Sequence, residues 1–190
     1  MLPFIFIIGG VIGLACAFII MQEKLHLLAN PNYKPSCSLN PVLSCGSVME
    51  SKQSHVFGFP NPFIGLAAFP MLATIGLAML SGAKFKRWFW LGVEAGTIFA
   101  VGFITWLFFQ SVYRIQALCI YCMIVWSVTI PIFLYTTLYN LREGHIATPA
   151  RLKGLVGFAG RHHGDILVAW YLLIAAAILT HFWYYWKTLF

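Results

Sequence analysis

Charged residues are scarce in this chain. Asp, Glu, Lys and Arg together make up only 9% of its 190 residues, whereas 61% are hydrophobic and the mean hydropathy is +0.83. An average soluble domain carries about 25% charged residues. The surface therefore has too few charges to keep the chain in water, which disfavours a soluble enzyme or a disordered chain and indicates an integral membrane protein.

Acidic residues are the rarest charged type. Five Asp and Glu stand against 12 Lys and Arg, which gives a formal net charge of +7. The basic residues form no continuous run, so they do not make the stripe that binds nucleic acid. In an apolar chain, scattered basic residues more often set orientation in the membrane. A GxGxxG motif for a nicotinamide or flavin dinucleotide is also missing.

Apolar runs long enough to cross a bilayer dominate the sequence. A spanning helix needs about 20 apolar residues, and five segments qualify: 2–21, 63–81, 88–110, 117–139 and 166–186. The first has neither the positive start nor the Ala-x-Ala site of a signal peptide, so we predict that it remains as a span. The runs do not alternate as barrel strands do. We predict an all-α membrane protein with five transmembrane helices.

Basic residues between these runs predict the orientation. Lys84, Lys86 and Arg87 lie close together in one connection, and segment 141–165 carries further Arg and Lys residues. Cytoplasmic loops are enriched in Lys and Arg. We therefore expect both connections and the N-terminus to be cytoplasmic, and the loop 22–61 and the C-terminus to be extracytoplasmic.

Four of the five cysteines then face the extracytoplasmic side. Cys37 and Cys45 lie in the loop 22–61, and Cys119 and Cys122 lie at the outer end of the fourth span. Disulfides persist outside the cytoplasm, so thiol–disulfide chemistry becomes the leading hypothesis. The fifth, Cys16, is expected to be a small buried hydrophobic residue.

The motif Cys119-Ile-Tyr-Cys122 is predicted to occupy the first turn of a helix. Residues three apart on a helix are close enough to form a disulfide with little backbone motion. The helix N-terminus also stabilises a thiolate. Half of a zinc site is the alternative interpretation of a CxxC motif.

The second pair encloses Asn40-Pro41, a dipeptide that favours a turn between Cys37 and Cys45. A short helix over 47–55 would place Cys45 near its positive end. A structural disulfide is one alternative, and a four-cysteine zinc site is another. A non-enzymatic metal-binding or assembly protein is therefore the second hypothesis beside a thiol relay.

These motifs resemble the vitamin K epoxide reductase family, particularly its bacterial members. The resemblance rests on the order Cys37, Cys45, Ser51, Phe57-Gly58-Phe59-Pro60-Asn61 and then Cys119-Ile-Tyr-Cys122. The bacterial inner-membrane oxidase of thiol oxidants resembles the chain less, because it places its CxxC in the first outer loop.

The resemblance implies a domain organisation. Residues 1–140 would form a four-helix catalytic bundle around a quinone, with the loop 22–61 carrying the first cysteine pair. Residues 141–165 would be a cytoplasmic loop, and residues 166–190 a fifth helix outside the bundle. The fused thioredoxin-like domain of some bacterial members is not expected, so the thiol partner would be a separate protein.

The resemblance also implies roles for individual residues. Cys37 and Cys45 would be the shuttle pair, and Cys119 and Cys122 the quinone-side pair. The expected contacts of the quinone are Asn61, Ser51, Phe57 and Trp126, the last of which replaces a Tyr of vertebrate members.

The resemblance predicts a membrane oxidoreductase that supports disulfide bond formation. It would oxidise a soluble DsbA-like thioredoxin-fold protein and pass two electrons to menaquinone or ubiquinone. No metal ion is expected in this mechanism.

Overall fold

The computed structural model describes residues 1–30, 32–147, 149 and 153–187, and its regular elements are helices. They are α1 (Leu2–Ala29), α2 (Cys45–Glu50), the 3₁₀ helix η1 (Lys52–His55), α3 (Pro62–Leu80), α4 (Arg87–Phe109), the π-helix η2 (Gln110–Ile115), α5 (Ile120–Arg142), α6 (Lys153–Arg161), α7 (His163–His181) and α8 (Trp183–Trp186). Five of them are long and apolar enough to cross a membrane. The predicted all-α membrane protein is confirmed.

Helix α1 is longer than predicted. It continues from 21 to Ala29 because residues 22–29 contain no Gly or Pro, and it ends at Asn30, which is extended. Asn30 precedes a proline, and the residue before proline disfavours helical geometry. The expected loop 22–61 is therefore wrong at its start, since the connection begins only after Ala29.

The other boundaries shift by less. The predicted helix over 47–55 is replaced by α2, which begins at Cys45, followed by η1 after a break at Ser51. The fifth long helix begins at His163 rather than 166 and ends at His181. Residues 188–190, the end of the segment 166–190 that was expected to form the fifth helix, lie outside the described part of the chain.

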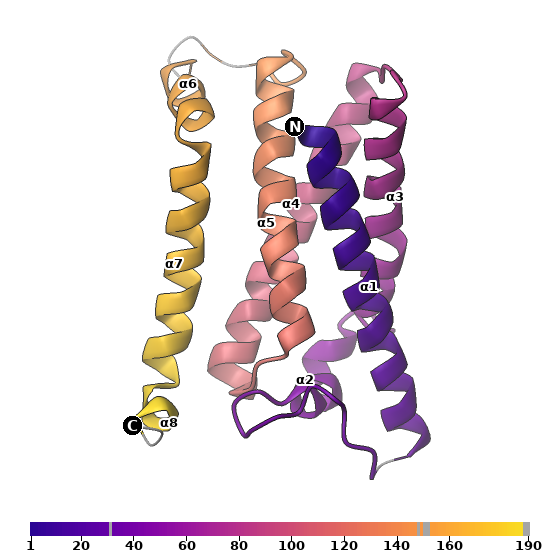
Figure 1. The fold of residues 1–190 in the computed structure, drawn as a ribbon, viewed down its shortest axis with the longest axis vertical. Coiled ribbons are helices and arrows are strands. Elements are labelled where there is room, and N and C mark those ends of the chain that lie inside the picture. Colours follow the sequence, from indigo (N-terminus) through magenta and orange to yellow (C-terminus); the bar gives the residue numbers. More distant parts are fainter. Residues whose placement is uncertain (31, 148, 150–152, 188–190) are drawn as a thin grey trace.

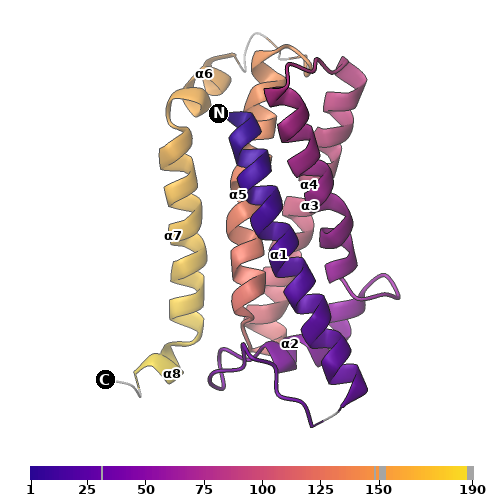
Figure 2. The same ribbon diagram turned by 45° about the vertical axis from the view of Figure 1, so that its right-hand side comes forward.

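Four long helices form one bundle. Helix α1 packs against α3 and α5, and α4 packs against α5, whereas α3 and α4 make hardly any contact with each other. Helix α7 stands beside α5 and away from α1 and α3 (Figures 1 and 2). The bundle is thus closed along three of its sides, and the side between α3 and α4 is left open.

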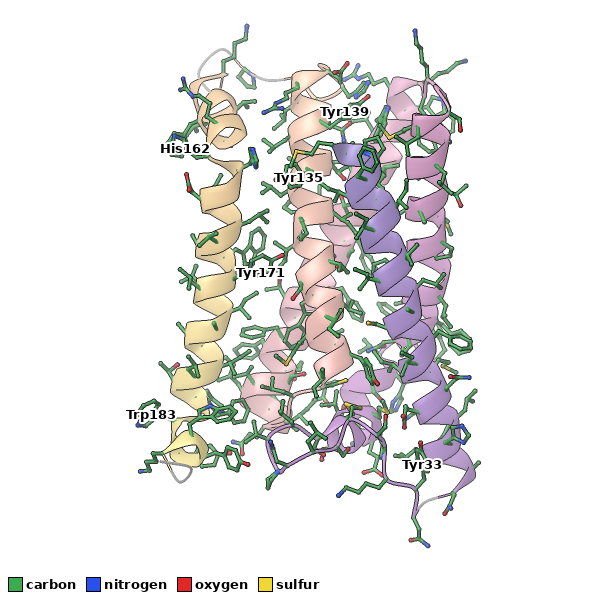
Figure 3. All side chains as sticks on the ribbon, viewed as in Figure 1. Tyr33, Tyr135, Tyr139, His162, Tyr171 and Trp183 are labelled. Carbon is green, nitrogen blue, oxygen red and sulfur yellow. A yellow bond between two sulfur atoms is a disulfide. The ribbon has the colours of Figure 1, made fainter. Side chains whose placement is uncertain are left out.

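Two hydrogen bonds attach α7 to α5. The Tyr171 hydroxyl donates to the Ser127 carbonyl at 2.6 Å, and the Tyr135 hydroxyl lies 2.7 Å from Nδ1 of His163 (Figure 3). No residue of α7 is buried. The arrangement of four bundled helices and one additional helix agrees with the prediction.

Glycines allow α1 and α3 to approach closely. A Cβ atom on Gly10 would lie 2.8 Å from the Phe69 carbonyl oxygen, and one on Gly76 would lie 2.7 Å from the Pro3 carbonyl oxygen. Small residues at such contacts are typical of membrane helices that associate through close packing.

Glu94 of α4 is buried at the end of the bundle opposite the loop that contains the Cys37–Cys45 pair, called the cysteine loop below. Its carboxylate accepts hydrogen bonds from Oγ1 of Thr137 at 2.7 Å and from Nδ2 of Asn140 at 2.8 Å. The carboxylate therefore has polar partners inside the bundle and does not reach toward the membrane surface, which supports a structural role.

Candidate redox site

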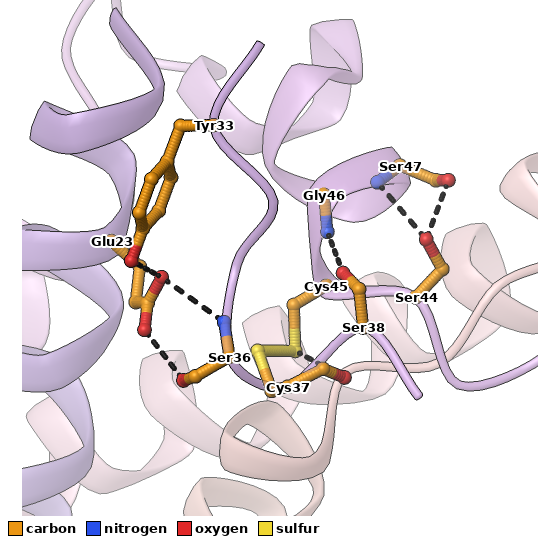
Figure 4. The surroundings of a disulfide bond; sticks show 9 residues. All are labelled: Glu23, Tyr33, Ser36, Cys37, Ser38, Ser44, Cys45, Gly46 and Ser47. Atoms are coloured by element: carbon orange, nitrogen blue, oxygen red, sulfur yellow. Dashed lines mark hydrogen bonds between the residues drawn. A yellow bond between two sulfur atoms is a disulfide. The ribbon is translucent and has the colours of Figure 1, made fainter. Parts of the chain in front are cut away.

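Cys37 and Cys45 form a disulfide, with Cα atoms 5.6 Å apart (Figure 4). The turn between them is held by Asn40, whose side-chain oxygen accepts from the backbone N–H groups of Val42 at 3.0 Å and Leu43 at 2.7 Å. An Asn that bonds its own following backbone is a standard turn former. The turn predicted at Asn40-Pro41 is confirmed.

One arm of the cysteine loop is fixed to α1 through Glu23. Its carboxylate accepts from the Ser36 hydroxyl at 2.6 Å, the Ser36 N–H at 3.4 Å and the Tyr33 hydroxyl at 2.9 Å (Figure 4). The hydrogen bond to Glu23 raises the pKa of Tyr33. The residue directly before Cys37 is thus held by a buried carboxylate.

The other arm is fixed to the segment before α5. Leu118 N–H donates to the Val42 carbonyl at 2.7 Å, Ser44 N–H donates to the Leu118 carbonyl at 3.0 Å, and Leu43 forms an isolated parallel bridge with Leu118. Leu118 directly precedes Cys119. These bonds bring the two cysteine pairs together, although 74 positions separate Cys45 from Cys119 in the sequence (119 minus 45).

Cys45 begins α2, as predicted, and Ser44 caps the helix by accepting from the Ser47 N–H. Cys119 is the N-cap of α5, and Cys122 lies in its first turn. The sulfur atoms of Cys37, Cys45 and Cys119 all lie within 4.8 Å of one another. Cys122 packs partly buried against the same cluster.

The Cys119 thiol lies at the N-cap of α5, just before the span, and its pKa is shifted. Its pKa is lowered, first by a hydrogen bond from the Cys122 thiol and further by the backbone N–H groups of Cys122 and Tyr121, while burial opposes the shift. The N–H groups at the first turn of a helix stabilise negative charge. Cys119 is therefore equipped to act as a thiolate.

The cysteines are buried. Cys37 is only 5% exposed, Cys45 is 0% exposed and Cys119 is 1% exposed. Cys37 is the more exposed of its pair, yet both residues are covered. A protein partner must therefore displace part of the loop to reach the disulfide.

A cavity of about 870 Å³ extends from the thiols along the bundle. Cys119 and Cys122 line one end, and Trp88 and Phe89 at the start of α4 line the other. Between them the wall is almost entirely apolar. Most polar lining groups gather near the thiols, namely Lys24, Ser51, Gln53, Ser54, Asn61 and Ser111.

Three of the four predicted quinone contacts line this cavity. They are Ser51, Asn61 and Trp126. The Asn61 amide donates to the Gln53 carbonyl at 2.7 Å and accepts from the Val56 N–H at 3.2 Å, so it also holds the turn before α3. The Ser51 hydroxyl donates to the Val48 carbonyl at 2.7 Å and does not bond the cysteines.

Phe57 lies outside the cavity wall. Its ring packs against those of Phe99 and Phe103, with centroids 6.4 and 5.6 Å away, whereas Phe59 lines the cavity. Gly58 lies between these two residues in the chain and has a φ of +82°, a conformation that favours glycine. We therefore assign Phe59 to the wall and Phe57 to its support.

Lys24, Gln53 and Ser54 also line the cavity and were not predicted as lining residues. The first span was expected to end at 21, which placed Lys24 in the loop 22–61. In a helix that continues to Ala29, Ala17, Ile20 and Lys24 follow one another at spacings of three and four residues and so lie on one face. This spacing was the signal in the sequence that could have identified Lys24.

Sulfur atoms this close also form a potential metal site. Reduced Cys37, Cys45 and Cys119 are near enough to bind one ion together. Metal binding requires thiolates. Two of the three sulfurs, those of Cys37 and Cys45, are instead joined in a disulfide. The arrangement in this structure thus favours sulfur exchange over metal binding.

Comparison with known proteins identifies a family for this chain. A family model described as the vitamin K epoxide reductase family matches residues 4–137. This range contains both cysteine pairs, the motif 57–61 and the four bundled helices. No curated protein matches the chain.

Proposed function

Because the chain belongs to the vitamin K epoxide reductase family, we propose that it takes two electrons from a separate dithiol protein and passes them to a membrane quinone. Family membership supports the coarser statement that this is a membrane thiol oxidoreductase. One observation carries the proposal: three sulfurs from both cysteine pairs lie within 4.8 Å, and the inner pair lines a long apolar cavity.

The first half of the reaction transfers electrons from the partner to the outer pair. A thiolate of the partner attacks Cys37, the Cys37–Cys45 bond breaks, and Cys45 leaves as a thiolate. The second thiol of the partner then breaks the mixed disulfide. The partner leaves oxidised, and Cys37 and Cys45 are both reduced.

The second half transfers electrons between the pairs. Cys45 attacks Cys119 of an oxidised inner pair, and Cys122 leaves as a thiolate; Cys37 then attacks Cys45 and releases Cys119. The product has an outer disulfide and an inner dithiol. The structure has this same pattern, with Cys37 joined to Cys45 and with Cys119 and Cys122 free.

The inner dithiol then reduces the quinone. A new Cys119–Cys122 bond forms, and two electrons and two protons reach the quinone as it becomes a quinol. Cys122 sits at the cavity wall one turn into α5. The thiols therefore lie where a reducible ring would bind.

The cavity fits a molecule with a polar head and a long apolar tail. The polar lining groups gather at the thiol end, and the remaining wall, including Leu72, Ile75 and Val93, is apolar. The side between α3 and α4 is hardly closed by helix contacts. A menaquinone or ubiquinone can thus extend its tail along the bundle and toward the lipid.

The charge distribution supports an orientation with the thiols outside the cytoplasm. The connection between α3 and α4 lies at the end of the bundle that holds the N-terminus, opposite the loop that carries Cys37 and Cys45 (Figure 1). Lys84 and Lys86 belong to this connection, and Arg87 begins α4. The positive-inside rule places that end in the cytoplasm. A dithiol partner in the oxidising compartment would then be a DsbA-like thioredoxin-fold protein.

The decisive experiment combines the purified protein with a reduced DsbA-like protein and ubiquinone-1 or menadione. We expect stoichiometric oxidation of the dithiol and reduction of the quinone. The Cys122→Ala variant should lose quinone reduction, whereas Cys16→Ala should keep it. Wild-type oxidation by the Cys122→Ala variant would overturn the relay.

A thiol-based metal or assembly function is the competing hypothesis, supported by the close approach of three sulfurs. It predicts stoichiometric zinc in the purified protein and four thiols that resist alkylation until a chelator is added. A Cys45–Cys119 disulfide trapped in a Cys37→Ala variant is expected only for the relay.

A further inference from the structure

Among the residues that the structure describes, Lys24 is the one basic side chain that lines the cavity. It lies on the face of α1 that also carries Ala17 and Ile20, both of which line the same cavity. Ile20 packs directly against the cysteine cluster. The helix therefore presents a charged group one turn beyond the residue that contacts the thiols.

The Lys24 ammonium is held at the cavity wall by a hydrogen bond to the main chain. It donates to the main-chain oxygen of Met49, which also accepts from the Ser54 hydroxyl at 2.6 Å. Met49 and Ser54 both line the cavity. An ammonium has three N–H donors, so this contact leaves two of them for a ligand.

No carboxylate neutralises this charge among the residues that the structure describes. The ion pair that these residues do form joins His162 and Asp165 at the start of α7, far from Lys24. The neighbouring Glu23 is turned away and bonds Tyr33 and Ser36 instead. A half-buried ammonium with free donors at the wall of an apolar cavity is placed to bind an electron-rich group of a ligand in that cavity.

We propose that Lys24 is a catalytic residue of quinone reduction, whose ammonium binds one quinone oxygen and donates a proton to it. This inference rests on the proposed function. Negative charge develops on the quinone oxygens as electrons arrive, and a fixed cation in a water-poor site stabilises such charge strongly. General acid catalysis at the same atom adds to this effect.

The protons and electrons of the step balance. The reduced inner pair begins as a Cys119 thiolate and a Cys122 thiol. Two electrons leave the sulfurs as the disulfide forms; Lys24 donates one proton to the quinone and the Cys122 thiol supplies the other. The products are a quinol, a disulfide and a neutral Lys24 amine, which regains its proton from water.

A purely structural role for Lys24 makes a different prediction. If the side chain only anchors α2 through Met49, its loss disturbs both cysteine pairs and slows both halves of the reaction. If it acts on the quinone, only the quinone half slows. The two half-reactions can be measured separately because the protein can be reduced or oxidised beforehand.

The test compares Lys24→Gln, Lys24→Arg and the control Lys52→Gln, an exposed lysine on η1. Protein with reduced cysteines is mixed with ubiquinone-1, and one turnover is followed by absorbance. We expect Lys24→Gln to slow this step about 100-fold. Lys24→Arg keeps the positive charge but cannot give up a proton, so it should slow the step less than Lys24→Gln does, and Lys52→Gln should remain within a few-fold of wild type. Reduction of the Cys37–Cys45 disulfide by a reduced DsbA-like protein should be unchanged in all three variants.

A second measurement does not depend on turnover. Ubiquinone-1 binding to the fully oxidised protein is followed by quenching of tryptophan fluorescence, to which Trp126 and Trp88 in the cavity wall contribute. We expect weaker binding by Lys24→Gln and near wild-type binding by Lys24→Arg.

An unchanged quinone step in Lys24→Gln overturns the inference, and so does an equal slowing of both half-reactions. If wild type oxidises dithiols and reduces ubiquinone-1 in these assays, the proposed function stands whichever result Lys24→Gln gives. If wild type does neither, the proposed function itself fails.

Discussion

At the residue scale, the lowered pKa of Cys119 depends on its neighbour. The Cys122 thiol donates a hydrogen bond that favours the Cys119 thiolate, and the helix N–H groups add to it. A lowered pKa means that the thiolate persists at pH values where an ordinary cysteine is protonated. Cys119 should therefore react with electrophiles at neutral pH faster than an ordinary buried thiol.

Removing this donor should raise the pKa of Cys119. We expect Cys122→Ala to slow carboxamidomethylation of Cys119 by iodoacetamide at neutral pH about tenfold, since a hydrogen bond to a charged group is worth roughly 1.5–3 kcal/mol. Cys122→Ser keeps a hydroxyl donor and is the matched control. Mass spectrometry over a pH series should show the midpoint move upward in the Ala variant and less in the Ser variant.

Glu23 should control how readily the outer disulfide opens. Glu23→Gln keeps the size of the side chain but weakens its bonds to Ser36 and Tyr33, at a cost of about 1–3 kcal/mol. We expect faster reduction of Cys37–Cys45 by dithiothreitol, because the loop is held less firmly over the sulfurs. Glu50→Gln, at the exposed end of α2, is the control, and equal rates in both variants would contradict this role.

At the element scale, the contact between α1 and α3 should tolerate almost no added volume. Alanine at Gly76 would place its Cβ 2.7 Å from the Pro3 carbonyl oxygen, so the helices must separate. Overpacking of this kind costs about 1–3 kcal/mol. We expect Gly76→Ala to lower the melting temperature in detergent, whereas Gly102→Ala, with nothing within 4 Å, should not.

Long apolar runs made the helices predictable from the sequence, because a bilayer requires about 20 consecutive apolar residues and polar connections between them. The end of α1 was not predictable in this way. Residues 22–29 carry Gln22, Glu23 and Lys24, so hydropathy ended the span although the backbone continued as helix. The break at Ser51 was also missed, since it depends on the contacts of α2.

The cysteine pairs were predictable as motifs, but their mutual distance was not. That distance depends on the bonds of Leu118 to Val42 and Ser44, and these main-chain groups carry no sequence signal. The cavity likewise combines residues from α1, α3, α4 and α5. Lys24 became a candidate only once those elements were assembled in space.

At the scale of the whole molecule, the orientation in the membrane decides which thiols the protein can oxidise. Cys37, Cys45, Cys119 and Cys122 pack in one cluster. Helix α2 and the start of α5, which carry three of them, lie at the end of the bundle opposite the N-terminus (Figure 2). The basic cluster Lys84, Lys86 and Arg87 accompanies the N-terminus. If this end is cytoplasmic, the dithiol partner must be on the opposite side, where thiols become disulfides.

Single cysteines in a chain whose five native cysteines are replaced by Ala provide the test. Ser47 is exposed on α2 at the thiol end, and Ala83 is exposed in the basic connection. We expect a membrane-impermeant maleimide to label Ser47→Cys from outside right-side-out vesicles, and Ala83→Cys only in inverted vesicles.

The reverse labelling pattern would place the thiols in the cytoplasm and exclude an extracytoplasmic partner.

The same assay tests the cause of the orientation, because Lys and Arg near the ends of spans determine it. Replacing Lys84, Lys86 and Arg87 with Gln leaves the thiol end intact but removes the densest positive cluster. A fraction of the molecules should then insert inverted, and their Ser47→Cys label should be lost from the outside in proportion.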